Sequence, residues 1–262
     1  MKQALHAEWT KLRTLSSTAW LLAAAVVSTM VLGAATTGSI HISRCPTPTH
    51  CPEDMTKLAF TGVWFGQVAV AVLAGLTVTN EYSSGMIHTT LVSNPRRFQV
   101  LTAKAAVITT VVVVAGMLAV AGSFVVARAV LQGNGFTAAK GYATLSLSDE
   151  PTMRAAAGTV IYLGLVALLT LGFATMIRDT AVALTTTLGI LFAFPIIAQF
   201  VSDPQLSKWL GRLSPMTAGL AVQATRDLRS LPIGPWAGLG VLAAYAGAAL
   251  LLGGVLFKVR DA

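Results

Sequence analysis

The residues whose types and spacing could support chemistry lie close together in the chain: His41, Cys45, His50 and Cys51. Imidazole and thiolate groups are common zinc ligands, and two cysteines can instead form a disulfide in an oxidising compartment. Structural zinc sites usually contain closer pairs such as Cys-x2-Cys, and the spacing here is different. We favour a disulfide between Cys45 and Cys51, with free thiols and a metal site as the alternatives.

The common catalytic motifs are absent from the sequence. No lysine follows a glycine, so the phosphate-binding loop Gly-x4-Gly-Lys-[Ser/Thr] is missing and the chain is not expected to hydrolyse ATP. The zinc motif His-Glu-x2-His and the nucleophile motif Gly-x-Ser-x-Gly are missing as well. We therefore expect a protein that is not an enzyme, with no catalytic residue, metal or cofactor of its own.

Long apolar segments must position any site in this chain. The sequence is 55% hydrophobic and 11% charged, with a mean hydropathy of +0.72, whereas soluble domains are about 25% charged. Its uncharged runs are continuous rather than alternating, which excludes a β-barrel, and each is longer than the roughly 20 residues that a spanning helix needs. We predict an all-α integral membrane protein with one transmembrane domain over 1–262. Its six spans are predicted at 19–40, 59–79, 105–127, 155–177, 180–201 and 236–257.

The distribution of positive charge bears on orientation. If the N-terminus is cytoplasmic, the 18 lysines and arginines divide into nine on each side, so a raw count decides nothing. The nine inner residues are concentrated in shorter segments close to helix ends, where the positive-inside bias is strongest. A disulfide between Cys45 and Cys51 would also require that loop to face outward. We predict that both termini are cytoplasmic and that the chain lies in the cell membrane.

Residues 1–18 have an amphipathic pattern. Leu5, Trp9 and Leu12 recur at helical spacing, and basic residues fill other positions. This pattern predicts an interfacial helix with Trp9 at the level of the lipid headgroups, and the alternative is a frayed basic terminus.

The second span contains a Gly-x3-Gly motif at Gly62 and Gly66, next to Phe65 and Gln67. Small residues four apart let helices approach closely, so this face is a candidate contact with another helix or with a second copy of the chain. Because polar groups at membrane depth tend to be paired or functional, Gln67 and Phe65 are candidate residues of a transport pathway. The alternative is ordinary glycine content in an apolar helix.

Residues 203–229 are amphipathic but too short to span. Leu206, Trp209 and Leu213 lie on one apolar stripe, Ser214-Pro215 interrupts it, and a second stripe continues toward Leu228. We predict two short amphipathic helices tipped into the outer leaflet between spans five and six.

The segment after the second span has the sequence Glu-Tyr-Ser-Ser-Gly-Met-Ile at 81–87, followed by Thr-Thr-Leu at 89–91 and Pro-Arg-Arg at 95–97. From Ser83 onward, its pattern predicts a short amphipathic helix that ends before Pro95. This segment resembles the one after the second helix of ABC-2-type ABC transporter permeases. The stretch Glu-Trp-Thr-Lys-Leu-Arg-Thr at 8–14 resembles the N-terminal interfacial helix of that family, particularly in its actinobacterial members, and the outer helices resemble its architecture.

The resemblance implies a permease subunit that pairs with a second permease, identical or homologous, and with two cytoplasmic ABC ATPase subunits, which would bind ATP and Mg. The stretch 81–91 would be the coupling helix that sits in a cleft of the ATPase. The candidate coupling residues are Glu81, Tyr82, Ser84, Gly85, Met86, Ile87 and Arg96. The corresponding candidates in the interfacial helix are Glu8, Trp9 and Lys11.

The expected function follows from a chain with six spans and no energy source of its own. Ionisable residues are lacking within the predicted spans, which argues against a proton-coupled antiporter. We predict the membrane subunit of an ATP-driven exporter that moves a hydrophobic or amphiphilic compound outward, such as an antibiotic or a peptide. The alternative is a membrane scaffold or mechanotransmission subunit that is coupled to an ATPase without transport. Lipid is an expected partner, and nucleic acid is not.

Overall fold

The computed structural model describes residues 2–41, 53–93, 96–137, 140, 142 and 145–259, and these residues form helices and no strand. Six of the helices are long and apolar enough to cross a membrane. They are α2 (Ser16–Gly38), α4 (Val63–Ser83), α6 (Arg97–Gly133), α7 (Glu150–Ile177), α8 (Thr180–Phe200) and α11 (Pro235–Val259). The predicted all-α class with six spanning helices is confirmed, and the chain is a multi-pass membrane protein.

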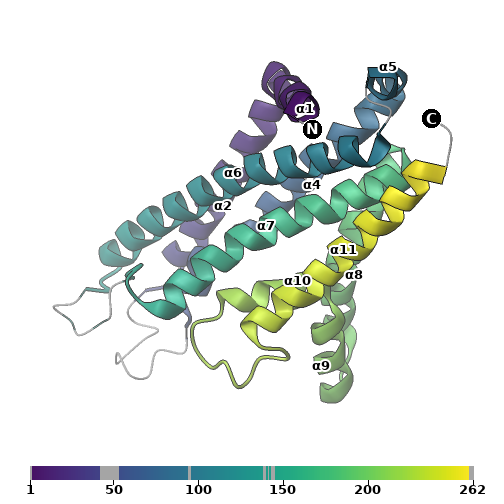
Figure 1. Cartoon of the computed structure of the whole chain (residues 1–262). Helices are drawn as coiled ribbons and strands as arrows, with labels where there is room; N and C mark the ends of the chain where they lie inside the picture. Colours follow the sequence, from purple (N-terminus) through teal and green to yellow (C-terminus); the bar gives the residue numbers. More distant parts are fainter. Residues whose placement is uncertain are drawn as a thin grey trace.

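Shorter helices lie at the two ends of this bundle. Figure 1 shows α1 (Lys2–Thr14) and α5 (Met86–Ser93) at the same end as the last turns of α11. The helix α9 (Pro204–Leu213) lies toward the opposite end. The remaining short elements are α3 (Met55–Ala59), α10 (Pro215–Leu220) and the 3-10 turn η4 (Ala221–Gln223).

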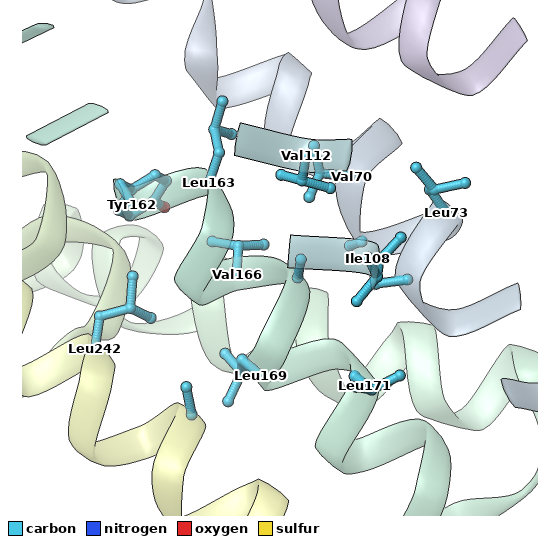
Figure 2. Close-up of a cluster of buried hydrophobic side chains, with 14 of the residues drawn as sticks. Val70, Leu73, Ile108, Val112, Tyr162, Leu163, Val166, Leu169, Leu171 and Leu242 are labelled. Carbon is cyan, nitrogen blue, oxygen red and sulfur yellow. The ribbon is translucent and has the colours of Figure 1, made fainter. Parts of the chain in front are cut away.

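The helix α7 is the centre of the bundle. It packs against α4, α6, α8 and α11. Figure 2 shows side chains from these layers meeting around it, including Val70 of α4, Ile108 of α6 and Leu242 of α11, together with Val166 and Leu169 of α7 itself. All five of these side chains are buried. The helices α4, α6, α8 and α11 therefore share α7 as a common neighbour, whereas α2 packs against α4 and α6.

Three spanning helices, α4, α6 and α7, differ from their predicted bounds by four residues or more, and α7 begins at Glu150 rather than at residue 155. The run 59–79 is interrupted after Ala59, where α3 ends, and the spanning helix resumes at Val63. The helix α6 has 37 residues, about 55 Å at 1.5 Å per residue, against a hydrocarbon core of about 30 Å. It therefore begins before the predicted start at residue 105 and extends past the predicted end at residue 127.

The Gly-x3-Gly motif packs inside the chain. A Cβ atom at Gly62 would lie 2.1 Å from the carbonyl oxygen of Thr29 in α2, and one at Gly66 would lie 2.4 Å from the Thr29 hydroxyl. The glycines therefore let α2 and α4 approach closely, as small residues do between membrane helices. Of the two predicted contacts, the one with another helix is confirmed, and the glycines do not face a second copy of the chain because α2 already covers them.

Gln67 is also enclosed by the bundle and does not line an open pathway. Its side-chain oxygen accepts a hydrogen bond from the Tyr162 hydroxyl, and its amide donates to the Met216 sulfur at 3.5 Å. Satisfying a buried amide in this way fixes α4 against α7 and α10. Of the four residues predicted for this face, Phe65 is the one that stays exposed.

Of the two predicted outer helices, only α9 is amphipathic and exposed. Trp209 and Leu213 of α9 face outward, whereas Met216 and Leu220 of α10 are buried. Helical structure ends at Gln223 rather than continuing toward residue 229. The Asp54 carboxylate explains this end, because it accepts hydrogen bonds from the backbone N–H of Thr225 at 2.6 Å and of Arg226 at 3.1 Å.

The close approach of α2 and α4 predicts an asymmetric response to adding one methyl group. Gly62→Ala would place a methyl group against a backbone carbonyl that cannot rotate away, so we expect a loss of about 1–3 kcal/mol in the free energy of unfolding. Gly240→Ala in α11 is the matched control, because a Cβ there meets no atom within 4 Å. Thermal unfolding of both variants in detergent is the measurement, and equal stability would contradict the packing argument.

Candidate functional site

The segment after the second span forms a helix, a tight turn and a second short helix. The helix α4 ends at Ser83, and the Ser84 hydroxyl donates to the carbonyl oxygen of Asn80 at 2.6 Å. Gly85 then adopts φ 71°, a left-handed conformation that is strained for residues with a Cβ atom. The turn redirects the chain into α5, which begins at Met86. The predicted helix exists, and it begins after the turn rather than at Ser83.

Four charged side chains from α1, α4 and α6 meet beside this turn, and we call them the charge cluster: Glu8, Lys11, Glu81 and Lys104. Glu81 accepts hydrogen bonds from the Nζ atoms of Lys11 and Lys104, each at 2.6 Å. Glu8 accepts from the same two amines, at 3.0 Å from Lys11 and 2.7 Å from Lys104. The two acids and two bases therefore alternate, and the cluster is neutral as a whole.

Most of the charge cluster is withdrawn from solvent. The side chains of Glu8, Glu81 and Lys104 are 8%, 5% and 5% exposed, and that of Lys11 is 35% exposed. Removing ions from water costs several kcal/mol each, and only good pairing geometry offsets that cost. Because each amine contacts both carboxylates, separating α4 from α6 would break the contact between Glu81 and Lys104, and displacing α1 would break the contacts of Lys11 with Glu81 and of Glu8 with Lys104. The cluster therefore fixes the relative positions of these three helices.

Lys11 also contacts α5. Its Nζ atom lies 3.4 Å from the Thr90 hydroxyl oxygen, so the same amine touches α1, α4 and α5. Burial alone would lower the pKa of Lys11, but the hydrogen bond to Glu81 and the charges of Glu8 and Glu81 outweigh it and raise the pKa. Lys11 is therefore held in its charged form at neutral pH.

The joint between α7 and α8 lies against the same end of α4. Arg178 caps α7 with φ 64°, and its guanidinium carbon lies 4.9 Å from the centre of the Tyr82 ring. The Thr180 hydroxyl donates to the Thr79 hydroxyl at 2.7 Å. Arg97 at the start of α6 donates to the carbonyl oxygen of Phe257 in α11 at 3.0 Å. The last turns of α4 are thus bordered by α1, by α6 and by the joint of α7 and α8.

The predicted coupling residues fall into a buried and an exposed group. Glu81 and Ile87 are buried and Tyr82 is half-buried, whereas Ser84, Gly85 and Met86 are exposed. Arg96 is exposed at the position before α6. In this conformation the charge cluster encloses the Glu81 carboxylate. Glu81 was predicted as a coupling residue, and it is not available here for direct contact with another protein.

The interfacial-helix residues divide in the same way. Trp9 is exposed, Glu8 is buried in the charge cluster, and Lys11 is partly covered. Sequence reasoning treated Lys104 only as the residue before a span and did not predict it as a site residue. One signal was available in the sequence. Glu81 directly follows one apolar run and Lys104 directly precedes the next, which makes the two residues candidates for pairing inside the bundle.

The described residues contain no group of three or more His, Cys, Asp or Glu side chains that could hold a metal. Cys45, His50 and Cys51 lie outside the residues that the structure describes, so the predicted disulfide stays a prediction.

Lys104 provides a test of the charge cluster. Lys104→Met leaves two buried carboxylates to one amine, so we expect a loss of about 3–5 kcal/mol in the free energy of unfolding. The double variant Lys104→Met with Glu81→Gln leaves the balanced pair of Glu8 and Lys11, and it should recover a large part of that loss. Unfolding in mixed detergent is the measurement, with Lys208→Met on exposed α9 as the matched control. Additive losses in the double variant would show that the two side chains do not interact.

Lys11 predicts a pH dependence. Its pKa is raised above the ordinary 10.5, so its contribution to stability is fully present below that pH and is lost as the pH rises through the folded-state pKa. The difference in unfolding free energy between the unaltered chain and Lys11→Met should be constant from about pH 7 to about pH 9 and should shrink above pH 10.5. Lys57→Met, at an exposed site, should show no such change, and a gap that widens with pH would reverse the argument.

Comparison with known proteins supplies a family but no activity. No curated protein matches the chain. Residues 51–262, which include α3 to α11, match the model of the family described as "Protein of unknown function (DUF2705)". Because this match covers most of the sequence, the chain belongs to that family.

Proposed function

We propose that the chain is the membrane subunit of an ATP-driven exporter of the ABC-2 type, and that α5 with the turn before it receives the ATPase. The observation that carries this proposal is a short, solvent-exposed helix, α5, which lies next to the enclosed charge cluster at the end of the spanning helix α4. A second permease and two ATPase subunits would complete the assembly, with ATP and Mg bound by the ATPase. The end of the bundle that carries α1 and α5 would then face the cytoplasm.

The surface of α5 suits a protein contact. Met86 is 48% exposed and Val92 is 84% exposed, and both lie on a helix whose Ile87 is buried against the bundle. Protein interfaces favour exposed methionine and depleted charge, and α5 carries no acidic or basic residue apart from His88. A largely uncharged exposed surface of this kind could sit in a cleft of a partner.

The mounting of α5 suits the transmission of force. Switching a two-state transporter from 1:99 to 99:1 needs a bias of about 5.5 kcal/mol, which must reach the spanning helices without being absorbed by a loose joint. The α5 helix is held by the Gly85 turn at one end and by the contact of Thr90 with Lys11 further along. We assign Glu81 and Lys104 as positioning residues, which keep α4 and α6 in place behind the contact surface.

The substrate would be a hydrophobic or amphiphilic compound, including antibiotics and peptides, as the family resemblance implies. Its pathway would lie between two permeases rather than inside this chain. The exposed ring of Phe65 remains a candidate for that pathway, because it is the residue of its group that is not covered by the chain's own helices.

Met86 provides the test of this assignment. We expect Met86→Glu to reduce at least tenfold the amount of ATPase that is isolated with the chain from its native membrane, since about 1.4 kcal/mol is tenfold in binding and a buried charge costs more. Met153→Glu, an exposed methionine at the start of α7, is the matched control. Co-isolated proteins are identified by mass spectrometry.

The outcomes separate the alternatives. Isolation of a protein with a phosphate-binding loop, lost in Met86→Glu and retained in Met153→Glu, supports the proposal. An intact, folded sample with no ATPase overturns it. An ATPase that is retained in both variants would place the contact elsewhere, and an ATPase without substrate transport would favour a scaffold or mechanotransmission subunit.

A further inference from the structure

An apolar groove lies between α2 and α6 at the end of the bundle that carries α1. Its volume is about 460 Å³, within the range of about 300–1,000 Å³ that is usual for ligand pockets. Ala23 and Val27 of α2 line one wall, Ala115 and Leu118 of α6 line the other, and Trp9 of α1 borders it. The short side chains of Ala23 and Ala115 leave the space between the two walls unfilled.

The groove offers hydrocarbon rather than hydrogen-bonding groups. Apart from the Trp9 indole, Thr110 is the one lining residue with a polar side chain, and its hydroxyl already donates to the carbonyl oxygen of Ala106 at 2.8 Å. An occupant therefore gains chiefly apolar contact, which suits an acyl chain and disfavours a polar ligand.

The groove borders a stripe of basic residues on α1. Lys2 lies seven positions before Trp9, His6 lies three before it, and Arg13 lies four after it. These spacings place the three basic residues and Trp9 on one face of the helix. These side chains are exposed. The only acid of α1 is Glu8, which is buried in the charge cluster and neutralised there. The exposed face of α1 next to the groove is therefore positive, with no compensating acid on the helix.

We propose that this groove binds an acyl chain of an anionic phospholipid in the leaflet next to α1, with the headgroup against the basic stripe that contains Arg13 and Lys2. Trp9 lies between the two parts, at the height where indole rings prefer the membrane interface. The basic stripe attracts anionic lipid, whereas a second copy of a chain with a formal net charge of +8 would bring more positive charge to it. This proposal does not depend on the identity of the ATPase or of the transported compound.

The test uses the full chain in vesicles of equal parts phosphatidylcholine and phosphatidylglycerol. A trace of either lipid carries the same photoreactive group near the end of one acyl chain, and labelled peptides are mapped by mass spectrometry. In the unaltered chain we expect labelling within 22–27 and 110–118, about fivefold stronger for phosphatidylglycerol. Equal labelling by the two lipids would overturn the proposal.

Two kinds of variant separate the tail from the headgroup. Ala23→Leu fills the groove and should abolish labelling, and Ala24→Leu, exposed on the same helix but outside the groove, should leave it unchanged. Arg13→Gln with Lys2→Gln should keep tail labelling but lose the preference for phosphatidylglycerol. If Ala23→Leu does not fold, as judged by thermal unfolding, Val27→Trp fills the same groove. Labelling that survives a filled groove would contradict the assignment.

Occupation by protein is tested in the same vesicles. A photoreactive amino acid at Val27 should crosslink to lipid, with a mass increase of one phospholipid. A crosslinked dimer of the chain would show that the groove is an interface between two copies and would overturn the lipid proposal.

Discussion

Neutralisation of four enclosed charges is the constraint on which one end of this bundle depends. Glu8, Lys11, Glu81 and Lys104 come from three helices that are far apart in the sequence, and each amine contacts both carboxylates. Desolvation makes each of these ions costly alone, so the alternating contacts hold α1, α4 and α6 against one another. The cluster therefore gives α1 a defined position, although that helix is short and half-exposed.

Within the bundle, helices are held together by close approach of their backbones, whereas at the end that carries α1 they are held together by charge pairing. Lipid tails are as apolar as leucine, so membrane helices associate through dense packing rather than through the hydrophobic effect. A Cβ atom at Gly62 would meet a backbone carbonyl of α2, and one at Gly172 of α7 would lie 2.7 Å from the Ala249 side chain of α11. These contacts join α2 to α4 and α7 to α11 as closely packed pairs. Motion during any transport cycle is then expected between such pairs rather than within them.

The sequence predicted the parts of this fold that the bilayer dictates and missed those set by tertiary partners. Six uncharged runs predicted six spans because the thickness of the hydrocarbon core fixes their length. The start of α6 was placed too late because Lys104 was taken as a boundary, whereas two carboxylates neutralise it and the helix continues. The second outer helix was extended too far because Asp54, which captures the amides of Thr225 and Arg226, lies 171 positions from Thr225. The pairing of Glu81 with Lys11 was equally invisible to helical periodicity, since 70 positions separate them.

The helix α1 links the two proposed surfaces, which are the ATPase contact on α5 and the apolar groove between α2 and α6. One face of this helix supplies Glu8 and Lys11 to the charge cluster, and the Trp9 face borders the apolar groove. Because Lys11 contacts both Thr90 of α5 and Glu81 of α4, a displacement of α5 must either carry α1 with it or break a contact of Lys11. A lipid that binds more tightly to one position of α1 would favour the matching position of α5. Linkage is reciprocal, so a partner that moves α5 would change the affinity for that lipid by the same factor.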